Sequence, residues 1–201
     1  MNRFEAALED IGRNIDALGR PWALVGALAV AARAEARATL DVDVAIAVEN
    51  HQQASEVVSS LRDMGYRWHS DFGGLMTSFL VPEGPDAGLR LDVLFSLTGI
   101  EAEVAKRAER IEVLPGLELP VASLGDLIAL KALGAGEPGR EHDWRDLRAL
   151  TARSSSKDLV IAHSAIALIG TRGHASASEL EARLAAVLEG RETPPKNSTE
   201  P

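Results

Sequence analysis

Two aspartates at the head of an apolar stretch, Asp41 and Asp43, have the residue type and spacing of a metal site. The stretch 41–48 is typical of a strand, whose side chains alternate between two faces. Both carboxylates therefore point the same way, about 7 Å apart at ~3.3 Å of rise per residue. Two like charges this close need a cation. Hard oxygen ligands suit Mg²⁺ or Mn²⁺, which retain waters and bind substrate phosphates, so the pair predicts a metal-bound nucleotide.

A third carboxylate, Asp92, lies in the mostly apolar stretch Leu89–Phe95, which is also typical of a strand. Aspartate is unfavourable inside a strand unless its side chain caps or binds something. Three carboxylates from neighbouring strands can hold two divalent ions. One ion positions and deprotonates an attacking hydroxyl, while the other binds a triphosphate and stabilises the leaving pyrophosphate. The three aspartates are therefore candidate catalytic and metal-binding residues.

A purely structural interpretation of the three aspartates is also available. In it, Asp41 opens a strand as a turn residue, Asp43 faces water and Asp92 caps a loop. An Asp-X-Asp pair alone would favour this interpretation. The glycine turn at Gly26, a helix-length run before the pair, and the later lone aspartate favour the metal site instead.

Charge and composition restrict the classes of partner. Thirty Asp and Glu against 21 Lys and Arg give a formal net charge of -9, which disfavours generic binding to nucleic acid because phosphates are repelled at long range. A local basic patch stays possible. The absence of cysteine excludes disulfides and thiolate metal sites. The charged N-terminus shows no signal peptide and the apolar runs are too short to span a bilayer, which favours the cytoplasm and no membrane partner.

The elements that must position these residues follow from apolar periodicity and turn residues. The pattern predicts an alternation of helices and strands, with helices over 2–18, 27–35, 52–64 and 98–107 and strands over 22–25, 41–48, 66–69, 75–81 and 89–95. A hairpin of 111–113 and 117–119 follows. Helices are then expected from the N-cap Ser123 to about 133 and over 140–152, 157–169 and 176–188. This order predicts an α+β (or α/β) sheet domain over 1–120, a helical C-terminal part over 121–190, and a disordered tail over 191–201.

The order and spacing of five motifs between about residues 20 and 152 resemble one known family. The motifs are Gly26–Ala29, Arg37-X-Thr39-X-Asp41-X-Asp43, Leu91–Leu94, Lys131 and Arg140-X-X-Asp143-X-X-Asp146. Together they look like the nucleotidyltransferase AbiEii/AbiGii toxin family, within the DNA polymerase beta-like nucleotidyltransferase superfamily. The resemblance implies a mixed β-sheet with flanking helices and a helical C-terminal part.

The resemblance also implies roles for the matched residues. Asp41, Asp43 and Asp92 would bind Mg²⁺ or Mn²⁺, and the turn Gly26–Ala27 would contact the triphosphate. Lys131 would bind phosphate, and Asp143 and Asp146 would flank the nucleotide cleft. Arg37 and Thr39 would orient the loop or the metal-bound phosphates, with simple turn and surface roles as the alternative.

Several of these residues have structural interpretations, and two positions depart from the family. Lys131 could extend from the edge of a buried helical face, and Asp143 and Asp146 could belong to a solvated ion-pair ladder with Arg145 and Arg148. Ala27 lacks the serine hydroxyl of the family, which leaves backbone N–H groups and a helix N-terminus to bind phosphate. His142 stands where lysine is common, and a neutral histidine removes a positive charge at pH 7.

The leading hypothesis is a metal-dependent nucleotidyltransferase that transfers a nucleotidyl group from a nucleoside triphosphate to a hydroxyl acceptor. The acceptor could be the 3′ end of a tRNA, as the toxin resemblance suggests, a protein or a small molecule, and a cognate antitoxin is a possible partner. One alternative is a catalytically inactive nucleotide-binding or protein-interaction module of the same fold. Another is an antibiotic-modifying nucleotidyltransferase.

Overall fold

The computed structural model describes most of the chain as two compact units. The described residues are 3–34, 39, 41–71, 73, 76–82, 89–95, 99–135 and 139–195. The first unit, called here the sheet unit, comprises 1–32 and 36–122, and the second, the helical unit, comprises 33–35 and 123–201. Among the described residues, no helix has the length and apolarity that crossing a membrane demands.

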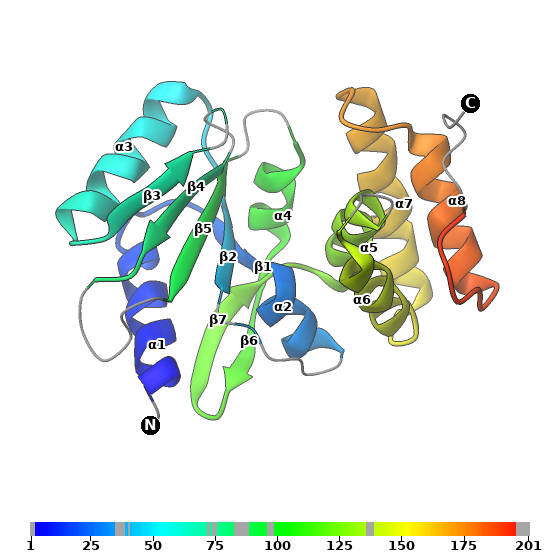
Figure 1. The fold of residues 1–201 in the computed structure, drawn as a ribbon, viewed down its shortest axis with the longest axis horizontal. Helices are drawn as coiled ribbons and strands as arrows, with labels where there is room; N and C mark the ends of the chain where they lie inside the picture. The colour runs from blue at the N-terminus through cyan, green and yellow to red at the C-terminus, as the bar shows by residue number, and fades with distance from the viewer. Residues whose placement is uncertain are drawn as a thin grey trace. The chain divides into compact units, whose positions relative to one another are not determined.

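The described part of the sheet unit contains a mixed, seven-stranded sheet with strand order β3-β4-β5-β2-β1-β7-β6 (Figure 1). The strands are β1 (Trp22–Val25), β2 (Asp41–Ile46), β3 (Arg67–Asp71), β4 (Met76–Leu80), β5 (Arg90–Phe95), β6 (Glu109–Leu114) and β7 (Leu117–Val121). The pairs β2–β5 and β1–β7 are parallel and the other neighbouring pairs are antiparallel. The helices of this unit are α1 (Arg3–Asp16), α2 (Gly26–Arg33), α3 (His51–Asp63) and α4 (Glu101–Arg107).

One face of the sheet forms the apolar core. The strand register places Val42, Val44, Leu91 and Val93 on this face, and all four are fully buried. Phe79 pairs with Leu91 and so lies on this face, where its ring meets the Tyr66 ring edge-on. Asn14 Nδ2 of α1 donates to the Tyr66 hydroxyl at 3.1 Å, which places α1 on the same face. A fully apolar face of this kind can only be stable when helices cover it. The opposite face is therefore the one on which charged side chains can lie.

The helical unit is built around one buried helix. It contains α5 (Leu124–Gly134), α6 (Glu141–Thr151), α7 (Ser156–Thr171) and α8 (Ala177–Leu188), and α5 packs against the other three. The hydroxyl of Ser123 accepts a hydrogen bond from the Asp126 N–H at 3.1 Å, which confirms the expected N-cap. A Cβ at Gly125 would lie 2.7 Å from Ile161 Cβ, so this glycine allows α5 and α7 to approach closely.

The mixed α/β fold that the sequence predicted is confirmed. Each predicted strand and helix has a counterpart in the structure, with ends shifted by a few residues. Helix α2, for example, starts at Gly26 and its last helical residue is Arg33, against an expected range of 27–35. Such shifts are ordinary, because helix ends depend on capping contacts that periodicity does not report.

Candidate functional site

The parallel pairing of β2 with β5 brings the three predicted carboxylates together. Asp43 pairs with Asp92, and Asp41 pairs with Arg90. Paired residues of neighbouring strands share a face, and residues two apart along a strand do too. All four side chains therefore lie on the sheet face opposite the apolar core. The Asp92 side chain is 8% exposed, whereas those of Asp41 and Arg90 are 43% and 41% exposed.

Arg90 connects two of the three carboxylates. Its Nη2 donates to Asp41 Oδ2 at 2.8 Å, and its Nε lies 3.1 Å from Asp92 Oδ2. The second contact is an ion pair without hydrogen-bond geometry, and the buried Nε finds no hydrogen-bond partner among the described residues. The hydroxyl of Ser78, a neighbour of Asp92 on β4, donates to Asp92 Oδ1 at 2.6 Å. Both oxygens of Asp92 are thus in contact with partner groups.

The glycine turn at Gly26 lies against the carboxylate of Asp43. Gly26, the first residue of α2, has φ +64°, a conformation that side chains rarely adopt. A Cβ added there would fall on the carboxylate of Asp43. Glycine is therefore required at this position both by the backbone and by the close approach of Asp43. Ala27 follows as a buried residue of α2.

Thr39 supports the entry to β2, where the carboxylate pair begins. Its hydroxyl accepts a hydrogen bond from the Asp41 N–H at 3.2 Å and also lies 3.3 Å from the Asp41 carbonyl oxygen. Thr39 thus fixes the backbone of the first metal-ligand candidate. Arg37, which the sequence also pointed to, lies outside the described residues.

The donor set on this face matches a hard divalent cation in chemistry. Three carboxylates on adjacent strand positions offer only oxygen ligands, which Mg²⁺ and Mn²⁺ prefer. In the part of the chain that the structure describes, however, no three His, Asp or Glu side chains are arranged to hold a metal ion together. The guanidinium of Arg90 instead supplies positive charge to Asp41 and Asp92.

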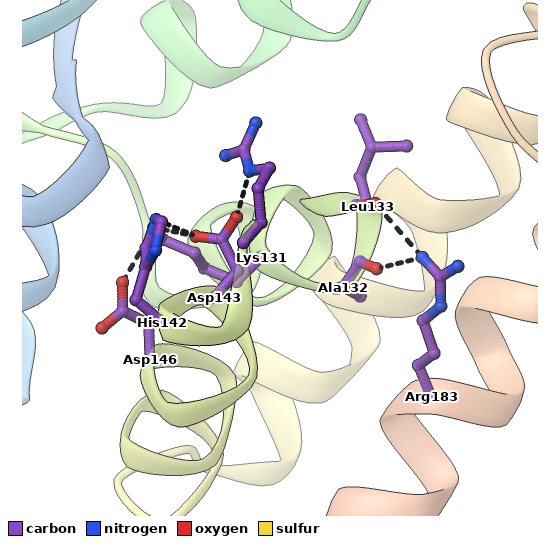
Figure 2. A network of polar contacts seen from close by, with 8 residues as sticks. Lys131, Ala132, Leu133, His142, Asp143, Asp146 and Arg183 are labelled. Atoms are coloured by element: carbon purple, nitrogen blue, oxygen red, sulfur yellow. Dashed lines mark hydrogen bonds and ion pairs between the residues drawn. The ribbon is translucent and has the colours of Figure 1, made fainter. Parts of the chain in front are cut away.

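A second cluster of predicted residues lies in the helical unit, between α5 and α6 (Figure 2). The Nζ of Lys131 lies 2.7 Å from Asp143 Oδ1 and 2.8 Å from Asp146 Oδ2. All three residues are buried, with Asp143 fully enclosed. The expectations of a lysine extending to solvent and of a solvated aspartate ladder are therefore wrong. The two aspartates turn toward the buried lysine because they share the α6 face that packs on α5.

Arg140 and His142 also lie beside Asp143. Arg140 Nε donates to Asp143 Oδ2 at 2.6 Å, and His142 Nε2 lies 3.5 Å from Asp143 Oδ1. Burial raises the pKa of the Asp143 carboxyl, but the Lys131 ammonium and the Arg140 guanidinium lower it by more, so its pKa lies below the ordinary value. Gly134 leaves room for this carboxylate, since a Cβ there would fall on Asp143 Oδ2.

Sequence reasoning missed Arg90 and Ser78 as members of the site. Arg90 precedes Asp92 by two residues, so the strand period already placed both on one face. Ser78 could not be found in this way, because its contact depends on the pairing of β4 with β5.

No protein-family model matches this sequence and no curated protein matches it, so membership of the AbiEii/AbiGii family stays a prediction. Solved structures do match. An antigenic nucleotidyltransferase-like protein from Paracoccidioides brasiliensis is 17% identical, with a TM-score of 0.56 over 92% of this chain and 96% of its own. The antibiotic-resistance factor ANT(2'')-Ia is 17% identical, with a TM-score of 0.54 over 84% and 94%. The nucleotidyltransferase toxin MenT4 from Mycobacterium tuberculosis is 15% identical, with a TM-score of 0.52 over 83% and 64%. This chain therefore has the fold of nucleotidyltransferase-like proteins.

Proposed function

We propose that this protein transfers a nucleotidyl group from a nucleoside triphosphate to a hydroxyl acceptor, with Mg²⁺ or Mn²⁺ held by Asp41, Asp43 and Asp92. The observation that carries the proposal is the register of β2 and β5, which sets the three carboxylates side by side on one sheet face. The glycine turn against Asp43 and the fold shared with nucleotidyltransferase-like proteins support it.

Each part of the site has a role in this proposal. A bound divalent cation would neutralise triphosphate charge and activate the acceptor hydroxyl. The three aspartates hold that cation, and Thr39 keeps the backbone of Asp41 in place. The first N–H groups of α2, after Gly26, bind phosphate oxygens, a role suited to a helix N-terminus. Because Ala27 has no hydroxyl, the backbone alone provides these donors.

The proposal extends to Lys131, Asp143 and Asp146 as nucleotide-binding residues. The Lys131 ammonium contacts both aspartates, so it binds a phosphate only after leaving at least one of them. Its first role is then to hold α5 and α6 together. Phosphate binding is a second role. The unfolding and KM measurements on Lys131→Met separate it from the role in packing.

The acceptor determines the biological setting. One structural neighbour is a nucleotidyltransferase toxin and another is an antibiotic-resistance factor by name. A tRNA 3′ end is the acceptor that the toxin setting suggests, with an antitoxin as partner, while a protein or a small antibiotic is the alternative. The net charge of -9 disfavours a nucleic-acid acceptor bound by charge alone.

The test is incorporation of labelled nucleotide, with each triphosphate in turn, into total tRNA, protein and small antibiotic acceptors in the presence of Mg²⁺. Asp43→Asn keeps the shape of the side chain and should lower turnover at least about a hundredfold, because a metal ligand is lost. Asp63→Asn, at an exposed carboxylate at the end of α3, is the matched control and should leave turnover unchanged. Full turnover in Asp43→Asn would refute the proposal.

A nucleotide-binding module without catalysis is a second candidate, because Arg90 already neutralises two of the three carboxylates. Titration calorimetry with each triphosphate, with and without Mg²⁺, separates it from an enzyme. A binding module takes up nucleotide without releasing pyrophosphate, whereas an enzyme given its acceptor releases pyrophosphate in step with incorporation.

A further inference from the structure

We propose that Arg90 is an internal counter-ion that competes with the divalent cation for Asp41 and Asp92, so that metal binding requires its guanidinium to leave these carboxylates. This inference rests on the proposed function, because it concerns the regulation of the same site. It assigns to Arg90 the control of metal affinity, a role distinct from those of the carboxylates.

The contacts of Arg90 are those of a competitor for metal ligands. Its guanidinium reaches Asp41 Oδ2 at 2.8 Å and Asp92 Oδ2 at 3.1 Å, so it spans two of the three candidate ligands. Since Ser78 donates to the other oxygen of Asp92, that carboxylate can add a metal ion most easily through the oxygen that Arg90 contacts. The same oxygen atom cannot be close to both the guanidinium and a metal ion without strong repulsion between the two cations.

Charge explains why such a counter-ion is useful. Asp41, Asp43 and Asp92 lie on adjacent positions of two paired strands, and Asp92 is almost completely buried. Carboxylates grouped in this way repel one another when no cation is near, and the buried carboxylate of Asp92 also loses hydration. Arg90 offsets part of this cost in the metal-free protein. It also holds the side chains of Asp41 and Asp92 in one orientation before a metal ion arrives.

The geometry also allows Arg90 to leave. Its side chain is 41% exposed, so the guanidinium can turn into solvent, where it is readily hydrated. The Nε contact with Asp92 lacks hydrogen-bond geometry, so this ion pair is weaker than a two-pronged arginine–carboxylate pair. A partly exposed pair of this kind is one that a doubly charged cation can displace.

The test is direct binding of Mn²⁺ alone to the full chain, measured by electron paramagnetic resonance or calorimetry. Arg90→Met keeps the aliphatic stem and removes the charge, and it should bind Mn²⁺ roughly tenfold more tightly than the unmodified protein. Arg110→Met is the matched control, because Arg110 is a half-exposed arginine of the same sheet that pairs with a remote carboxylate, Asp16, at 3.5 Å. Its Mn²⁺ affinity should not change. An Arg90→Met protein that binds Mn²⁺ no more tightly than the unmodified chain overturns the inference.

A second readout uses thermal unfolding in the presence of a chelator. Arg90→Met should unfold at a lower temperature than Arg110→Met, because Asp41 and Asp92 then lose the guanidinium beside them, and saturating Mn²⁺ should close the gap. If Arg90→Met does not fold, Arg90→Lys replaces it. A lysine contacts carboxylates as a point charge and spans two of them less well, so its Mn²⁺ affinity should lie above that of the unmodified protein. Equal affinities would again overturn the inference.

The failure of this inference differs from the failure of the proposed function. Tighter Mn²⁺ binding by Arg90→Met without any nucleotidyl transfer in the unmodified protein sinks the enzyme proposal and supports the counter-ion. Metal-dependent transfer by the unmodified protein, with unchanged Mn²⁺ affinity in Arg90→Met, supports the enzyme proposal and contradicts the counter-ion role of Arg90. Absence of Mn²⁺ binding in both proteins contradicts both proposals.

Discussion

Gly26 and Asp43 depend on each other, because the carboxylate occupies the space that any side chain at position 26 would need. Gly19 provides a control for this dependence. It has nearly the same backbone angle, φ +65° against +64°, yet nothing lies within 4 Å of its Cβ position. Comparing the two glycines separates the cost of the backbone conformation from the cost of the contact.

We expect Gly19→Ala to lower the free energy of unfolding by about 1 kcal/mol, the cost of a left-handed residue. Gly26→Ala should lower it by roughly 2 to 4 kcal/mol, because the methyl group also displaces the Asp43 carboxylate. Urea unfolding of both variants measures the difference. Nucleotidyl transfer, where present, should be lost only in Gly26→Ala. Equal destabilisation of the two variants would show that Asp43 does not depend on Gly26.

The shared direction of the candidate ligands was predictable, and their charge partner was not. The strand period gave one face for Asp41 and Asp43, and the same rule places Arg90 with Asp92. The sequence does not show that β2 pairs with β5, and this pairing is what brings Arg90 to Asp41. Arg90 and Asp41 are 49 positions apart in the chain, and no local pattern reports a contact over that distance. The strand period therefore places Arg90 on the face of Asp92 but does not report its contact with Asp41.

At the scale of elements, Lys131 ties α5 to α6 through two buried carboxylates. Lys131→Met would leave Asp143 and Asp146 buried without their main counter-ion. Removing one partner of a buried ion pair typically costs 3–5 kcal/mol, so we expect a loss of about that size in the free energy of unfolding. Lys157→Met, at an exposed lysine of α7, should cost less than about 0.5 kcal/mol. A cost as small as that of the control would mean that this cluster does not join the helices.

The phosphate-binding role of Lys131 has a separate readout. If Lys131 also binds the triphosphate, Lys131→Met should raise the KM for nucleotide at temperatures where the variant is fully folded. Asp146→Asn loosens the cluster but keeps the ammonium, so comparing the two variants separates the phosphate contact of Lys131 from the contribution of the cluster as a whole. A KM that rises equally in both variants would indicate that the cluster acts only through the packing of α5 on α6.

The pKa of Asp143 gives this cluster a pH dependence. Its carboxyl has a pKa below the ordinary 3.8, so the stabilisation from its ion pairs is complete above the pKa of the unfolded chain and is lost as pH falls through the folded pKa. Asp143→Asn should therefore be less stable than the unmodified protein by an amount that is constant above about pH 5 and shrinks below about pH 4. Urea unfolding over this range measures it. A difference that grows on acidification would contradict the assignment.

The elements themselves were largely predictable because each has a strong local signal. Ser123 caps α5 as predicted, and apolar spacing marks the buried faces of the helices. The burial of Lys131, Asp143 and Asp146 was not predictable. Periodicity shows that Asp143 and Asp146 share a helical face, but only packing decides whether that face meets water or another helix.

At the scale of the whole molecule, a bound ligand stabilises the native chain by an amount fixed by its concentration and affinity. At a hundredfold excess over the dissociation constant this amounts to about 2.7 kcal/mol. Because the carboxylates belong to the sheet unit, hydrogen exchange should show where a Mg²⁺–nucleotide complex acts. We expect added protection in β2 and β5 and none in α7, which serves as the internal control.

The same experiment decides whether the helical unit takes part in binding. If Lys131 binds phosphate as proposed, α5 should gain protection together with β2 and β5. Protection confined to the two strands would restrict the nucleotide site to the sheet unit and leave Lys131 as a structural residue. Asp43→Asn should abolish all of these changes, whereas Asp63→Asn should retain them. Protection that persists in Asp43→Asn would place the nucleotide somewhere other than the carboxylate face, because a ligand held through the metal site cannot act there once a metal ligand is removed.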